Sequence, residues 1–108
     1  IGSEAAKRLL FLDELWNAER ALNAGLVGEV VADEQLQAQV GEFAARLAAG
    51  PTYAFGHTKR LIREGASRTL AQQLEAEQAA GLLCGRSEDA AEALRAVAEK
   101  RSPQFKGR

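Results

Sequence analysis

Apolar residues recur at helical spacing along nearly the whole chain. After Asp33, for example, Leu36, Val40, Phe43 and Leu47 are four, three and four residues apart, which places them on one face of a helix. Leu, Ala, Glu, Gln and Arg, which favour helices, dominate the composition, and Pro occurs only twice. The pattern therefore predicts an all-α chain with about five helices.

Residues that begin and end helices divide this pattern into segments. We expect a first helix over residues 1–12 and a short second helix over 18–24, ended by Gly25 in the left-handed conformation. Pro51 suits the first position of another helix, where a missing N–H costs nothing. Three side chains are expected to cap later helices: Asp33, Thr69 in a capping box with Gln72, and Ser87.

Two further stretches stand out. Residues 26–31 are rich in β-branched side chains and are the one short strand-like segment, too short to form a sheet alone. We expect them to need partner strands or a docking surface outside this chain. In the last helix we expect acidic residues in the first turn and Lys100 and Arg101 in the last turn, where the helix dipole favours each sign.

Composition and charge narrow the class of protein. Hydrophobic residues make up 46% of the chain and charged residues 27%, as in soluble globular proteins. A net charge of −1 gives no basic excess for nucleic acid, and no apolar run is long enough to span a membrane. The single cysteine, Cys84, cannot form an internal disulfide, so we expect a cytoplasmic protein. Because Met is absent and residue 1 lies inside a helical pattern, we also expect an upstream part before Ile1.

Four blocks of sequence occur in a recognisable order. They are residues 18–27 with the Val30-Val31 pair, residues 47–51 followed by Lys59, residues 69–77, and residues 87–108. In this order and spacing they resemble the C-terminal part of the enoyl-CoA hydratase/isomerase, or crotonase, family from end to end. Three positions depart from the family pattern: Ala93 replaces the usual Gly, Val97 the usual Phe, and residues 12–13 a Thr-Gly pair.

The resemblance implies that residues 1–108 form one region, the C-terminal helical part of the crotonase-like α/β superhelical fold. Family members act on acyl-CoA thioesters, for example by hydrating or isomerising enoyl-CoA in fatty acid metabolism, with an oxyanion hole that stabilises a thioester enolate. The oxyanion donors and catalytic acids belong to the upstream core, so no catalytic residue and no metal or cofactor site is expected in residues 1–108. Coenzyme A enters as part of the substrate.

The resemblance also implies partners and contact residues. The helices would pack on neighbouring subunits in a trimer or a dimer of trimers, and the last helix would close the CoA pocket. Lys100 matches the family's CoA-contacting lysine, Val97 occupies the position of an aromatic contact, and Phe105 could stack on adenine or, as we prefer, anchor the tail in an apolar slot. The alternative interpretation of Lys100 is a solvated cation that complements the helix dipole.

The remaining reactive side chains have structural interpretations. His57 lacks a triad or metal partner at a recognised spacing, and Cys84 is expected to be a small buried apolar residue. Glu77 lies on the apolar stripe of its helix and would need a cation beside it, Lys59 or Arg60. An alternative to the enzyme hypothesis remains: a freestanding helical interaction module whose amphipathic faces bind a partner helix, with no catalytic role.

Overall fold

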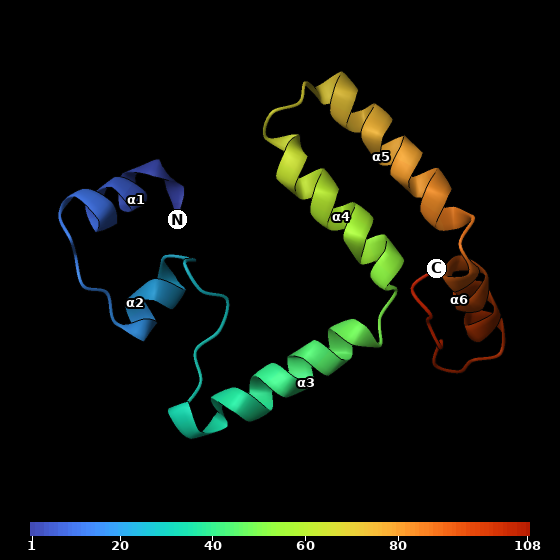
Figure 1. Ribbon diagram of the computed structural model, residues 1–108, viewed down its shortest axis with the longest axis horizontal. Helices are drawn as coiled ribbons and strands as arrows, with labels where there is room; N and C mark the ends of the chain where they lie inside the picture. The colour runs from blue at the N-terminus through green and yellow to red at the C-terminus, as the bar shows by residue number, and fades with distance from the viewer. The chain divides into compact units, whose positions relative to one another are not determined.

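The computed structural model describes residues 1–108, and all of its regular secondary structure is helical. The chain divides into two compact units, residues 1–39 and 40–108. Six α-helices and one 3₁₀ turn follow in order (Figure 1): α1 Gly2–Phe11, α2 Ala18–Asn23, the turn Asp33–Gln35, α3 Leu36–Ala48, α4 Thr52–Gly65, α5 Leu70–Gly85 and α6 Glu88–Ala98. The predicted all-α class is confirmed. None of these helices is both long and apolar enough to cross a membrane.

In the first unit, local hydrogen bonds define α2 and its end. The side chain of Asn17 accepts a hydrogen bond from the backbone N–H of Arg20, 2.8 Å away, and so caps the start of the helix. Gly25 has φ of 74°, a left-handed conformation that costs glycine little, and it turns the chain at the end of α2. The cap predicted at Gly25 is therefore confirmed.

Polar contacts of Glu14 stabilise the connection between α1 and α2. Its carboxylate accepts a hydrogen bond from Trp16 Nε1 at 3.1 Å and forms ion pairs with Arg8 and Arg20 at 2.7 and 2.5 Å. The Arg20 guanidinium also lies over the Trp16 ring, 4.6 Å from its centre. The Trp16 hydrogen bond, together with the two arginines, holds the pKa of Glu14 below its usual value.

Residues 26–31 form no strand, since no other extended stretch of residues 1–108 completes a ladder of hydrogen bonds with them. That they need partner strands or a docking surface outside this chain stays a prediction. The cap predicted at Asp33 is wrong. Asp33 does not cap α3; it lies inside a 3₁₀ turn that precedes the helix, and its side chain makes no capping bond. A cap at Asp33 would have started the helix at residue 34, but residues 33–35 form the 3₁₀ turn and α3 starts at Leu36.

Helices α4 and α5 form an antiparallel hairpin in the second unit (Figure 1). Thr69 and Gln72 make the predicted capping box at the start of α5, with both reciprocal hydrogen bonds present. In the connection, Arg68 forms an ion pair with Glu64 at 2.5 Å. Pro51 stands one residue before α4 rather than inside its first turn.

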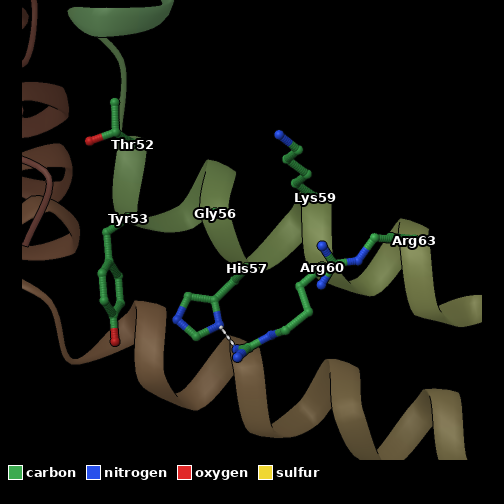
Figure 2. A pocket seen from close by; sticks show the side chains of 7 residues that line it. All are labelled: Thr52, Tyr53, Gly56, His57, Lys59, Arg60 and Arg63. Carbon is green, nitrogen blue, oxygen red and sulfur yellow. Dashed lines mark hydrogen bonds between the residues drawn. The ribbon is translucent and has the colours of Figure 1, made fainter.

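The surroundings of two side chains on the hairpin, Glu77 and His57, can be compared with the predictions. Glu77 is exposed and accepts a hydrogen bond from Gln73 Nε2 at 3.0 Å, so the predicted buried carboxylate with a Lys59 or Arg60 partner is wrong. Helix α5 faces solvent at this position, and the carboxylate needs no cation there. His57 on α4 lies beside Arg60, as Figure 2 shows.

Helix α6 starts as predicted and ends early. Ser87 Oγ accepts a hydrogen bond from the N–H of Ala90 at 3.1 Å, which confirms the cap. The last helical residue is Ala98, and Lys100 has φ of 52°. Because this left-handed residue turns the chain away, Lys100 and Arg101 lie beyond the helix and not in its last turn, contrary to prediction. The N–H of Lys100 still bonds the carbonyl of Val97.

The buried apolar residues of the chain are all alanines: Ala21, Ala80 and Ala96. No large side chain is fully buried, whereas exposed large hydrophobic residues occur on every α-helix. On the second unit they include Ile62, Leu70 and Leu94, each at least 75% exposed. The few buried apolar residues are therefore small, and most of the large apolar side chains remain uncovered within residues 1–108.

Candidate functional site

Of the residues predicted to contact CoA, Val97 lies on α6, Lys100 lies just beyond the helix end, and Phe105 lies in the tail, residues 101–108. Asp89 in the first turn of α6 organises this tail. It is 4% exposed, and its two carboxylate oxygens accept hydrogen bonds from the backbone N–H groups of Lys106, at 2.7 Å, and Gly107, at 2.9 Å. The N–H of Asp89 donates in turn to the carbonyl of Arg108 at 2.9 Å. The tail thus returns to the start of α6.

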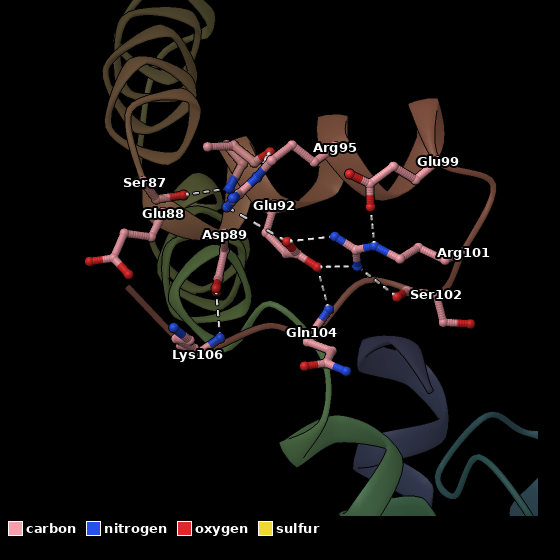
Figure 3. Close-up of polar contacts among 12 residues, drawn as sticks. Ser87, Glu88, Asp89, Glu92, Arg95, Glu99, Arg101, Ser102, Gln104 and Lys106 are labelled. Carbon is pink, nitrogen blue, oxygen red and sulfur yellow. Dashed lines mark hydrogen bonds and ion pairs between the residues drawn. The ribbon is translucent and has the colours of Figure 1, made fainter.

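Glu92, one turn further along α6, holds the middle of the tail (Figure 3). Its carboxylate meets the Arg101 guanidinium through two contacts, at 2.5 and 3.1 Å, and accepts a hydrogen bond from the N–H of Gln104 at 2.9 Å. These donors, Arg101 first, lower the pKa of Glu92 to about 2. Reciprocally, Glu92 and then Glu99 raise the pKa of Arg101.

Gly107 shows how closely the tail approaches α4. Its φ is 73°, and a Cβ atom added there would lie 2.5 Å from the Thr52 hydroxyl. Both the backbone conformation and the lack of room therefore require glycine. The tail joins the start of α6 to the start of α4.

Phe105 lies in the wall of a mainly apolar cavity of about 260 Å³ where α4, α5 and α6 meet. The side chain is half-buried. The other lining residues are Pro51, Ala54, Cys84, Gly85, Ser87, Asp89, Ala90 and Ala93. This position agrees with the anchoring role preferred for Phe105, and it leaves Cys84 half-buried rather than fully enclosed.

Val97 and Lys100 are placed differently from Phe105. Val97 is 78% exposed on α6, and Lys100 is exposed just beyond the helix end. Lys100 forms no ion pair within residues 1–108, although Arg95 and Arg101, near it in the sequence, both pair with Glu92. The Lys100 ammonium group thus has no carboxylate partner in residues 1–108, whereas the Phe105 side chain lies in the wall of the apolar cavity.

The sequence reasoning missed the part that Asp89 and Glu92 play. Asp89 was linked only to the helix dipole, and Glu92 was given no structural role, but the carboxylate of each accepts hydrogen bonds from backbone N–H groups of the tail. A usable signal was present: the two acids stand three residues apart on α6, ahead of a tail that contains four basic and no acidic residues from Lys100 onward. No group of three or more His, Cys, Asp or Glu side chains is arranged to hold a metal ion.

The chain is similar in sequence and structure to known proteins of one family. The family pattern of enoyl-CoA hydratase/isomerase matches residues 1–108. A 1,2-epoxyphenylacetyl-CoA isomerase of Escherichia coli K12 is 37% identical over 99% of this chain and 41% of its own length. An enoyl-CoA hydratase structure from Geobacillus kaustophilus is 34% identical, with a TM-score of 0.93, over 100% of this chain and 41% of that one. A solved Pseudomonas aeruginosa protein is 77% identical over 71% of this chain and 33% of that one, with a TM-score of 0.66.

The chain thus spans about two-fifths of the length of the first two of these proteins. The match extends from α1 to the end of the tail, as the four ordered sequence blocks predicted. Residues 1–108 belong to the enoyl-CoA hydratase/isomerase family and correspond to its C-terminal helical part.

Proposed function

We propose that residues 1–108 are the assembly and pocket-closing region of an enzyme that hydrates or isomerises enoyl-CoA thioesters. The catalytic acids and the oxyanion donors would lie in a preceding α/β core. The observation that carries this proposal is the family match over the whole chain. Several relatives of the chain are named for acyl-CoA reactions, among them a crotonyl-CoA hydratase of Syntrophomonas wolfei.

The uncovered apolar surface supports the assembly role. The outward side chains Ile62, Leu70 and Leu94 are largely exposed on α4, α5 and α6. Soluble proteins seldom leave many large apolar groups in water, because burial of each is worth roughly 1.5–3 kcal/mol. A preceding core and neighbouring subunits in a trimer, or a dimer of trimers, would cover these groups.

The end of α6 supports the pocket-closing role. The exposed side chains of Val97 and Lys100 follow one another at the helix end, and the Lys100 ammonium has no carboxylate partner. An unpaired ammonium beside an apolar surface suits a ligand that carries phosphates next to an aromatic ring, as CoA does. Phe105 would contribute indirectly, by anchoring the tail that follows Lys100.

The test is the hydration of crotonyl-CoA by the full-length protein, followed through the loss of ultraviolet absorbance of the enoyl thioester. Wild-type protein should be active and should have the mass of a trimer or a multiple of one in solution. Lys100→Gln should raise KM about fivefold, the effect of losing one exposed ion pair worth about 1 kcal/mol, and leave kcat unchanged. Added salt should raise the wild-type KM more than that of the variant.

The matched control is Lys7→Gln, which removes an exposed lysine on α1 that forms no ion pair. It should leave KM within a factor of about two, since it removes the same charge without a CoA contact. A monomeric, inactive wild-type protein would contradict the proposal as a whole. Equal KM values for Lys100→Gln and Lys7→Gln would contradict the role of Lys100 alone.

A further inference from the structure

One side of α4 carries a cavity of about 540 Å³ whose walls contain no carboxylate. The lining residues are Thr52, Tyr53, Gly56, His57, Lys59, Arg60 and Arg63. Four of these side chains are basic, and two more carry hydroxyl groups. All seven belong to α4, so hydrogen-bond donors line one side of an open hollow, a composition that suits an anion.

Tyr53, His57 and Arg60 form an ordered row on one side of the helix (Figure 2). The Arg60 guanidinium lies 2.8 Å from His57 Nδ1, and the rings of Tyr53 and His57 meet edge to face with centres 4.8 Å apart. Arginine can only donate, so Nδ1 accepts and the neutral imidazole carries its proton on Nε2. His57 is thus held between two neighbours and keeps one N–H free to donate to a ligand.

The basic side chains along this side of α4, namely Lys59, Arg60 and Arg63, are poorly neutralised by carboxylates. Lys59 and Arg60 form no ion pair, and Arg63 meets Glu64 only at 3.4 Å. Glu64 is itself in closer contact with Arg68, at 2.5 Å. Arg63 stands three residues after Arg60 and four after Lys59, so these like charges repel across adjacent turns of the helix. An anion bound at the cavity would relieve this repulsion.

We propose that the row Tyr53–His57–Arg60, with Arg63 beside it, binds the phosphate group of a small phosphorylated molecule. Arg60 supplies charge-assisted donors and is held in position by His57, while His57 Nε2 and the Tyr53 hydroxyl supply two neutral donors. Arg63 stands ten residues after Tyr53, about 15 Å further along the helix, and adds to the positive potential. Lys59 points away from this row and contributes only to the surrounding potential (Figure 2). The site is assigned to phosphate as such, whether free or carried on a nucleotide.

The experiment is a calorimetric titration of the full-length protein with inorganic phosphate, pyrophosphate and coenzyme A at constant ionic strength. Wild-type protein should bind pyrophosphate saturably. Arg60→Gln should weaken that binding roughly tenfold, the loss of one charge-assisted hydrogen bond. His57→Phe keeps an aromatic ring against Tyr53 but removes both ring nitrogens, and should weaken binding about threefold.

The matched control is Arg46→Gln, which removes an exposed arginine of α3 that forms no ion pair. It should change the dissociation constant by less than about twofold. Absence of saturable phosphate and pyrophosphate binding by wild-type protein, or equal losses for Arg46→Gln and Arg60→Gln, would overturn the proposal. If Arg60→Gln fails to fold, as judged by circular dichroism, His57→Phe decides in its place.

The coenzyme A arm separates the two sources of phosphate. If coenzyme A competes with pyrophosphate and binds Arg60→Gln more weakly, the phosphate recognised on α4 belongs to the coenzyme. If coenzyme A and pyrophosphate bind together, the ligand is a separate phosphorylated molecule. Both results support the α4 site, and neither depends on the outcome for Lys100.

Discussion

Replacement of Asp89 by Asn should release the C-terminal tail from α6. The buried carboxylate accepts two backbone N–H groups, from Lys106 at 2.7 Å and from Gly107 at 2.9 Å. A hydrogen bond to a charged group contributes about 1.5–3 kcal/mol. Asn keeps one oxygen as a weaker neutral acceptor and turns its NH₂ group toward the second backbone N–H, so two donors face each other.

The expected cost is at least about 2 kcal/mol, since one charge-assisted bond is lost and the other is weakened. That free energy corresponds to a roughly 30-fold larger opening equilibrium for the tail. Hydrogen exchange measures this directly, because the amide protons of Lys106 and Gly107 exchange only when the tail opens. Both should exchange about 30-fold faster in Asp89→Asn than in the wild-type protein.

Glu88→Gln is the matched control for Asp89→Asn. It removes the same charge from the same helix turn, but Glu88 is exposed and contacts only the Arg108 guanidinium, at 3.2 Å. The two amides should then exchange within about threefold of the wild-type rate, as expected for an exposed ion pair. Exchange in Asp89→Asn that stays within that threefold range would refute the argument that the carboxylate holds the tail.

Two further perturbations test other parts of the fold. The pKa of Glu92 is about 2 in the folded chain, below its ordinary value of 4.5, so the stability that its carboxylate contributes is complete above pH 4.5 and is lost as the pH falls toward 2. Exchange of the Gln104 amide, corrected for the intrinsic rate, should therefore rise in the wild-type protein as the pH falls through this range, and Glu92→Gln should abolish the rise. A variant that retains the rise would contradict this reasoning. Thr69→Ala removes the cap of α5, which is worth about 1 kcal/mol, and should speed exchange of the Gln72 amide about fivefold. Ser67→Ala, which removes only a hydroxyl bonded to the Glu64 carbonyl, should leave that amide unchanged.

Helix starts were predictable where the signal is local. Thr69 with Gln72, and Ser87, cap their helices as expected, because a capping bond joins residues only three apart and depends little on the rest of the fold. Asp33 shows the limit of such signals. Its residue type suits a cap, but a 3₁₀ turn formed instead.

Features that depend on distant residues were not predictable in the same way. The bonds from Asp89 to the tail join residues 17 and 18 positions apart, and no short pattern reports them. Residues 26–31 have strand-forming side chains, yet a strand requires a partner, which residues 1–108 do not offer. The sequence placed the predicted CoA contacts on α6 and the segment that follows it, and their role stays a prediction. The carboxylates of Asp89 and Glu92 that hold this segment were found only in the structure.

The left-handed backbone at Lys100 has a consequence for how this region could change over time. Glycine adopts φ of 52° freely, whereas lysine is disfavoured there by roughly 1–2 kcal/mol. A glycine at this position would make the end of α6 more stable and would remove the ammonium group. Under the proposed role of Lys100, selection for a more stable helix end and selection for a cation that binds the ligand would act in opposite directions on this one residue.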